Sequence, residues 1–137
     1  MRILEKIKEL EKFLSELESF IPEEFLEYEK DIKTKAACER YFEKITESIF
    51  DIINLLIKEK IVKSSEKNQE VIDILQKENI ISQRLTENLK DAKGMRNILA
   101  HKYGNVDDKI VFESITKELI RDVNQFIKSV KKDIMGK

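Results

Sequence analysis

Hydrophobic residues recur along this chain at the spacing of amphipathic helices and not at the alternation of strands. At the N-terminus the hydrophobic positions are three and four residues apart, as in a seam that packs against a neighbouring helix. These positions are Ile3, Ile7, Leu10, Leu14, Leu17 and Ile21. They predict a first helix from about Ile3 to Ile21, which Pro22 ends unless it opens the next one. Since the seam is short for a coiled coil, we expect a helix bundle.

A wider hydrophobic face follows between about Asp31 and Lys60, and its width indicates a central, heavily buried helix. The face consists of Ala37, Tyr41, Ile45, Ile49, Ile52, Ile53, Leu55, Leu56 and Ile57. The segment Glu23–Lys30 before it is either a short turn of its own or a lead-in.

The same predicted helix carries a carboxylate at every fourth position. The row consists of Glu39, Glu43, Glu47 and Asp51. Like charges at this spacing are mildly unfavourable, and the simpler interpretation is a solvated face with Arg40 and Lys44 nearby. The alternative is that the row faces a basic segment at residues 82–103.

Capping residues divide the second half of the chain into further helices. Asn68 is placed to cap a short helix that ends near Gln76, and Ser82 is placed to cap a helix that runs toward Tyr103. Gly104 then suits the left-handed position just past a helix end.

A last helix is expected from Asp107, as its cap, to about Lys132, with Val106 and Val111 in the positions of a hydrophobic staple. Its hydrophobic side consists of Ile110, Val111, Ile115, Leu119, Ile120, Val123, Phe126, Ile127 and Val130. The pattern shows no internal repeat and no strand alternation. We therefore predict an all-α fold, an up-and-down bundle of four main helices plus a short one, as a single domain over residues 1–137.

Composition supports this class. Only four of the 137 residues are glycine or proline, which excludes all-β folds that need frequent turns. The 41% of hydrophobic residues is too high for a disordered chain. With one cysteine and one histidine, the chain lacks the residues of an internal disulfide or a structural zinc site. We expect neither a metal nor a cofactor.

Charged residues are dense near the N-terminus, where a signal peptide or membrane anchor would be apolar. The longest apolar stretch, Ile52 to Ile57, is well short of the ~18 residues of a membrane span. A cytoplasmic protein that does not associate with membranes is therefore expected. The net charge of −1 argues against a polybasic nucleic-acid binder. Residues 82–103 nevertheless hold five basic and two acidic side chains, and they include the single histidine.

The basic segment places its polar residues together when drawn as a helix. At about 100° per residue, one polar sector contains Lys90, Lys93, Arg96, Asn97 and His101. The complementary, apolar arc contains Leu85, Ala92, Met95, Ile98 and Leu99. Gly94 inside this helix costs about 1 kcal/mol relative to alanine, and close approach of another backbone is the expected reason for it.

Arg96, His101 and Tyr103 form an Arg-x4-His-x-Tyr motif, which resembles that of HEPN-domain proteins and specifically the HepT-like toxins. The resemblance extends over about residues 10 to 130. Flanking segments that share it are 37–43, 47–52, 72–75, 80–81, 94–97 and 106–107. It implies a HEPN-like fold and a metal-independent endoribonuclease that works as a homodimer and cleaves single-stranded or transfer RNA. It also implies an operon partner, a small nucleotidyltransferase antitoxin (MntA-like), which silences the toxin by attaching AMP to Tyr103.

The residues suit that chemistry. Cleaving RNA without a metal needs a base for the 2′-hydroxyl proton and an acid for the leaving oxygen. Histidine serves both roles because its unperturbed pKa of about 6.5 lies near neutral pH. A two-fold dimer would bring two His101 side chains into one cleft. Arg96 would stabilise the phosphoryl oxygens, and Asn97 would orient His101 or donate to phosphate.

Three lysines in the same segment, Lys90, Lys93 and Lys102, would guide the RNA backbone, and such binding weakens with salt. Tyr103 would stack a base or lie at the rim of the site. AMP on its hydroxyl would block the cleft and add negative charge.

Other functions remain open on the sequence alone. A HEPN domain can also be a non-catalytic partner of a nucleotidyltransferase that supplies a nucleotide- or substrate-binding groove or a dimerisation surface. A lone histidine at a helix C-terminus is often only a capping residue. A ferritin-like di-metal bundle is excluded, because it needs Glu-x-x-His on two helices. Helix-turn-helix DNA binding is disfavoured by the near-neutral total charge. A purely structural bundle leaves the clustering of Arg96, Asn97, His101 and Tyr103 unexplained.

Overall fold

The computed structural model describes residues 2–60, 70–101 and 107–136, and within these ranges the regular structure is entirely helical. The elements are α1 (Arg2–Phe20), α2 (Phe25–Lys30), α3 (Ile32–Lys60), α4 (Val71–Lys77), α5 (Gln83–His101), α6 (Asp108–Glu113), the π-helical segment η1 (Ser114–Leu119) and α7 (Ile120–Met135). The predicted all-α class is confirmed.

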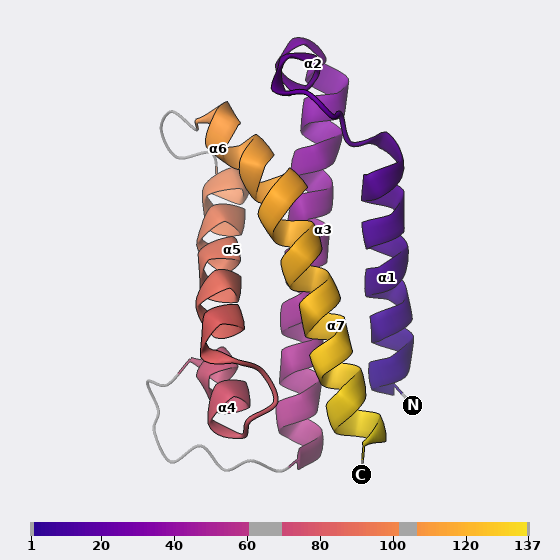
Figure 1. The fold of residues 1–137 in the computed structure, drawn as a ribbon, viewed down its shortest axis with the longest axis vertical. Helices are drawn as coiled ribbons and strands as arrows, with labels where there is room; N and C mark the ends of the chain where they lie inside the picture. The colour runs from indigo at the N-terminus through magenta and orange to yellow at the C-terminus, as the bar shows by residue number, and fades with distance from the viewer. Residues whose placement is uncertain (1, 61–69, 102–106, 137) are drawn as a thin grey trace.

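Helix α3 is the centre of the bundle. It contacts α1, α2, α4, α5 and η1, while α7 contacts α1 and α5. Figure 1 shows the long helices α1, α3, α5 and α7 along the long axis of the molecule, with α2 at one end and α4 at the other. The prediction of a central, heavily buried helix is therefore correct, and the segment Glu23–Lys30 before it contains the short helix α2.

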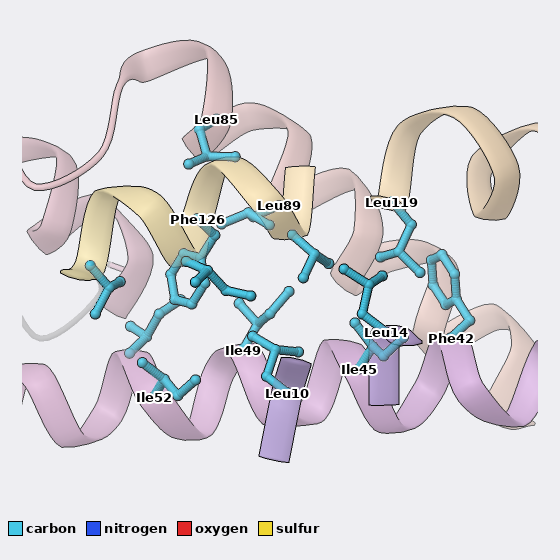
Figure 2. Close-up of a cluster of buried hydrophobic side chains, with 14 of the residues drawn as sticks. Leu10, Leu14, Phe42, Ile45, Ile49, Ile52, Leu85, Leu89, Leu119 and Phe126 are labelled. Atoms are coloured by element: carbon cyan, nitrogen blue, oxygen red, sulfur yellow. The ribbon is translucent and has the colours of Figure 1, made fainter. Parts of the chain in front are cut away.

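The hydrophobic core forms where the sequence pattern predicts it. The seam of α1 is buried, with Ile3, Ile7, Leu10, Leu14 and Leu17 each at most 4% exposed. On α3, the side chains that point into the bundle are fully buried, among them Ile45, Ile49, Ile52 and Ile53. Figure 2 shows side chains from α1, α3, α5, η1 and α7 meeting in one cluster.

Two of the predicted helix caps are confirmed. The Ser82 hydroxyl accepts a hydrogen bond from the backbone N–H of Leu85 at 3.1 Å, and the Asp107 carboxylate accepts from the N–H groups of Lys109 and Ile110. The N-cap position of α4 is Glu70, whose side chain makes no capping hydrogen bond. The residues predicted to cap or staple at Asn68, Gly104 and Val106 lie outside the described residues.

The last helix is not the uninterrupted α-helix that we expected over residues 107–132. It passes through the π-helical segment η1 and continues to Met135. Four buried residues are spaced strictly four apart here, namely Val111, Ile115, Leu119 and Val123. In an α-helix each such step overshoots a full turn by about 40°, whereas in a π-turn, which has more residues per turn, a step of four falls short of a full turn and offsets part of this drift. The π-segment thus lets all four face the core.

Tyr28 of α2 buries a hydroxyl group without a hydrogen-bond partner among the described residues. Its ring is fully buried, with its centroid 5.1 Å from that of Phe112 on α6. Burial, and to a smaller extent the nearby charge of Glu39, raises the pKa of the Tyr28 hydroxyl. The ring therefore stabilises the α2–α6 contact, while the unpaired hydroxyl lowers the free energy of unfolding.

We predict that Tyr28→Phe raises the free energy of unfolding by about 1 kcal/mol, because an unpaired buried hydroxyl costs about 1–3 kcal/mol. Urea denaturation followed by circular dichroism measures the change. Tyr41→Phe is the matched control, since the Tyr41 hydroxyl donates to Glu16 Oε1 at 3.1 Å and its removal offers no such gain. Equal destabilisation by both substitutions would contradict the prediction.

Candidate nuclease site on α5

The side chains of the predicted site lie on α5, which is held in the bundle by one buried face. Ser82 caps its first turn, and the residues that anchor it are Leu85, Thr86, Leu89 and Leu99, each at most 2% exposed. Because these residues fix the rotation of α5 about its axis, they also decide the direction in which each polar side chain leaves the helix.

Arg96 points toward α3 and is only partly accessible. Its Nη1 lies 3.7 Å from Oε1 of Glu47, and its side chain is 28% exposed. Its Nε atom is buried and has no hydrogen-bond partner among the residues that the structure describes. One turn earlier, the Lys93 ammonium lies 5.3 Å from the ring centroid of Phe50, also on α3. Helix α3 therefore holds both of these cations.

Lys90 points toward α4 instead. Its ammonium donates to Asp73 Oδ1 at 2.7 Å and lies 3.9 Å from a carboxylate oxygen of Glu70. The hydrogen bond with Asp73 raises the pKa of Lys90. The charge of this lysine is thus largely matched within the chain.

Asn97 and His101 are exposed on the outer side of α5, and His101 is the last residue of the helix. The polar sector predicted from the helical wheel is therefore divided three ways. Lys93 and Arg96 turn to α3, Lys90 turns to α4, and Asn97 and His101 face outward. Tyr103 and Lys102 lie outside the described residues, in the connection between α5 and α6.

One expectation about α5 is wrong: Ile98, assigned to the buried arc, is 42% exposed. The backbone expected to approach Gly94 is not found within the described part of this chain, where an added side chain would meet no atom within 4 Å. The cause is the rotation of α5: its buried arc is centred near Leu85 and Leu89, and Ile98 falls outside it on the same outer side as Gly94 and His101.

The two interpretations of the carboxylate row on α3 are each correct for part of it. Glu47 faces the basic segment and pairs with α5. Asp51 instead lies 3.9 Å from Lys6 on α1, and Glu43 pairs with Arg40 on its own helix at 3.3 Å. Sequence reasoning did not single out Glu47 within the row, because the pattern does not give the offset of α3 and α5 along their axes.

A pocket of about 90 Å³ lies between α3, α5, η1 and α7. It is lined by Phe42, Asn88, Asp91, Ala92, Met95, Ser114, Glu118, Leu119 and Asp122. Its α5 residues leave the helix on the flank opposite Lys93 and Asn97, so this pocket is separate from the predicted site.

The described residues contain no group of three or more His, Cys, Asp or Glu side chains placed to hold a metal ion. Burial raises the pKa of the Cys38 thiol to about 11. Among the described helices none combines the length and the apolar character needed to cross a membrane.

An all-α bundle with an Arg-x4-His motif at the end of α5 fits the HEPN class of proteins. The sequence also matches the family described as "Ribonuclease HepT-like" over residues 3–130. This chain belongs to that family.

Named relatives agree with this assignment. A protein of Archaeoglobus fulgidus named putative RNase is 30% identical over 130 residues, which cover 93% of this chain and 96% of the relative. The mRNA nuclease HepT of Shewanella oneidensis is 26% identical over 105 residues, covering 77% of this chain and 78% of the relative. The tRNA nuclease HepT of Aphanizomenon flos-aquae is 25% identical over 122 residues, covering 85% and 83%.

Solved structures share the fold. A tri-AMPylated HEPN toxin of Shewanella oneidensis in complex with its MNT antitoxin superposes with a TM-score of 0.84 at 22% identity, covering 94% of this chain and 96% of that one. A toxin–antitoxin structure with AMP-PNP gives a TM-score of 0.82 at 22% identity, with the same coverage. The HEPN fold predicted from the sequence is confirmed.

Proposed function

We propose that this chain is the metal-independent endoribonuclease toxin of a HEPN/nucleotidyltransferase toxin–antitoxin system, acting in the cytoplasm. The observation that carries the proposal is the exposed position of His101 at the end of α5, five residues after an arginine that α3 holds in place. Membership of the HepT-like family and relatives named as nucleases of mRNA and tRNA support it.

Two copies of His101 supply the acid and the base. One imidazole takes the proton of a ribose 2′-hydroxyl as its oxygen attacks the adjacent phosphorus. The other gives a proton to the 5′-oxygen as the phosphorus–oxygen bond breaks, which leaves a cyclic phosphate. Each role is worth about 10²–10⁴ in rate. Arg96 stabilises the charge that builds on the phosphoryl oxygens, and Asn97 orients His101 or donates to phosphate.

A homodimer through the outer side of α5 brings the two imidazoles together. Gly94, where an added side chain would meet open space, and Ile98, 42% exposed, lie on that side with His101. A small residue beside an exposed hydrophobic one lets two helices approach closely. In a two-fold interface the same surface is used by both chains, so His101 meets its own copy.

RNA binding is assigned to the lysines of the same region. Lys93 and Lys102 are the stronger candidates, because Lys90 already pairs with Asp73 and Glu70. Single-stranded or transfer RNA is the proposed substrate, and the contacts to its phosphates weaken as the salt concentration rises.

Regulation is assigned to Tyr103 and a nucleotidyltransferase antitoxin, MntA-like, as partner. Support comes from the fold neighbours, which include an AMPylated HEPN toxin bound to its MNT antitoxin. Tyr103 comes two residues after His101 in the sequence. AMP on its hydroxyl would place a bulky anion next to the imidazole and repel RNA.

The test is cleavage of end-labelled RNA by the purified full chain in the presence of EDTA. We expect the parent to cleave and the double variant Arg96→Ala/His101→Ala to be inactive. The matched control Arg84→Ala, which removes an exposed cation from the first turn of α5, should retain activity. Equal cleavage by parent and double variant would mean a contaminating nuclease. RNA binding by the parent without cleavage would favour the non-catalytic binding partner instead.

A further inference from the structure

One carboxylate on α3 is distinguished from its neighbours by its partner. Of the row on α3, Glu43 pairs within its own helix and Asp51 pairs with α1, whereas Glu47 reaches across to Arg96 of α5. The ion pair between Glu47 and Arg96 joins α3 to α5 next to the motif, at 3.7 Å. Its side chain is 48% exposed, so it lies at the edge of the bundle and not in its core.

The orientation of the Arg96 guanidinium depends on its ion pair with Glu47. Its Nε is buried and has no hydrogen-bond partner within the described ranges, so no residue there fixes the guanidinium from that side. Nη1 faces the Glu47 carboxylate. A free arginine side chain has many rotamers, and a carboxylate 3.7 Å from one end of the planar group favours the rotamers that keep the guanidinium beside it.

We propose that Glu47 is a positioning residue for Arg96: it holds the guanidinium in the orientation that meets the phosphoryl oxygens. The inference rests on the proposed nuclease function and deepens it. Glu47 acts through Arg96 and makes no contact with RNA. Its negative charge works against RNA binding, and its benefit is confined to the orientation of the arginine.

These opposite effects make the role measurable. Glu47→Gln keeps the size of the side chain and removes its charge. Loss of repulsion leaves KM for an RNA oligonucleotide unchanged or lower. Loss of orientation lowers kcat by about 10- to 100-fold, because a displacement of the order of 1 Å at a reacting group can cost about 10² in rate. A carboxylate that only repelled RNA would change KM and leave kcat as it was.

Glu43→Gln and Asp51→Asn are matched controls, since they remove the same charge from the same row but from residues paired elsewhere. We expect kcat of both controls within about twofold of the parent, and thermal denaturation confirms that all variants fold. Unchanged kcat in Glu47→Gln, or an equal fall in the controls, overturns the positioning role.

A second measurement is independent of catalysis. ¹⁵N relaxation of the arginine Nε–H groups, with the Arg96 signal identified by its absence in Arg96→Lys, reports how ordered this side chain is. We expect Glu47→Gln to lower the order parameter of the Arg96 Nε–H, while the two controls leave it unchanged. If the parent shows no cleavage that depends on Arg96, the proposed function fails, and the relaxation result still decides the role of Glu47. Equal order in parent and Glu47→Gln rejects it.

Discussion

Replacing His101 by alanine is expected to lower the rate of RNA cleavage by about 10²- to 10⁴-fold. The side chain is exposed at the end of α5, outside the hydrophobic core, so its loss leaves the bundle folded. It is the single histidine of the chain, so no other imidazole can replace it in the same copy. Initial rates on a defined RNA oligonucleotide measure the effect. Arg84→Ala, which removes an exposed side chain from the first turn of the same helix, should leave the rate unchanged.

Mixed dimers extend this test to the pairing of the two chains. When parent and His101→Ala chains are refolded together in equal amounts, random pairing puts parent chains on both sides of about one quarter of the dimers. If each cleft needs both imidazoles, the activity of the mixture falls to about one quarter of that of pure parent. Activity near one half would show that each chain works alone, which contradicts the shared cleft.

The fold could be predicted from the sequence because its strongest signals are periodic. The seam of α1 and the wide face of α3 specify which sides are buried, and Ser82 and Asp107 specify where helices begin. The π-segment η1 is not predicted by ideal α-helical spacing, and the signal for it is the strict four-residue repeat from Val111 onward.

The candidate site could be predicted in its residues but not in its geometry. A helical wheel gives the angle between Arg96 and His101 but not the rotation of α5 within the bundle, which the packing of its neighbours decides. The wheel therefore placed Ile98 in the core, whereas the structure places it outside. For the same reason the sequence could not say which carboxylate of the α3 row meets Arg96, since that depends on how far α3 and α5 are displaced along their axes.

A charge at Ile98 is expected to separate the proposed dimer without unfolding the chain. In the single chain the Ile98 side chain is 42% exposed, so Ile98→Glu buries no charge and should leave the melting temperature of the bundle nearly unchanged. In a two-fold interface through this side of α5, each glutamate meets the same surface of its partner. Like charges juxtaposed at an interface cost several kcal/mol, and about 3 kcal/mol corresponds to a more than 100-fold weaker dimer.

Sedimentation equilibrium measures the dimer constant, and the cleavage rate should fall with the population of dimers. Ile32→Glu is the matched control, because Ile32 is 79% exposed and lies on α3, not on α5, and its replacement removes an equally large apolar side chain. A shared cleft requires that Ile98→Glu loses dimer and activity together, and that raising the protein concentration restores both in parallel. If Ile98→Glu dimerises as tightly as Ile32→Glu, the outer side of α5 is not the interface, and two His101 side chains do not meet there.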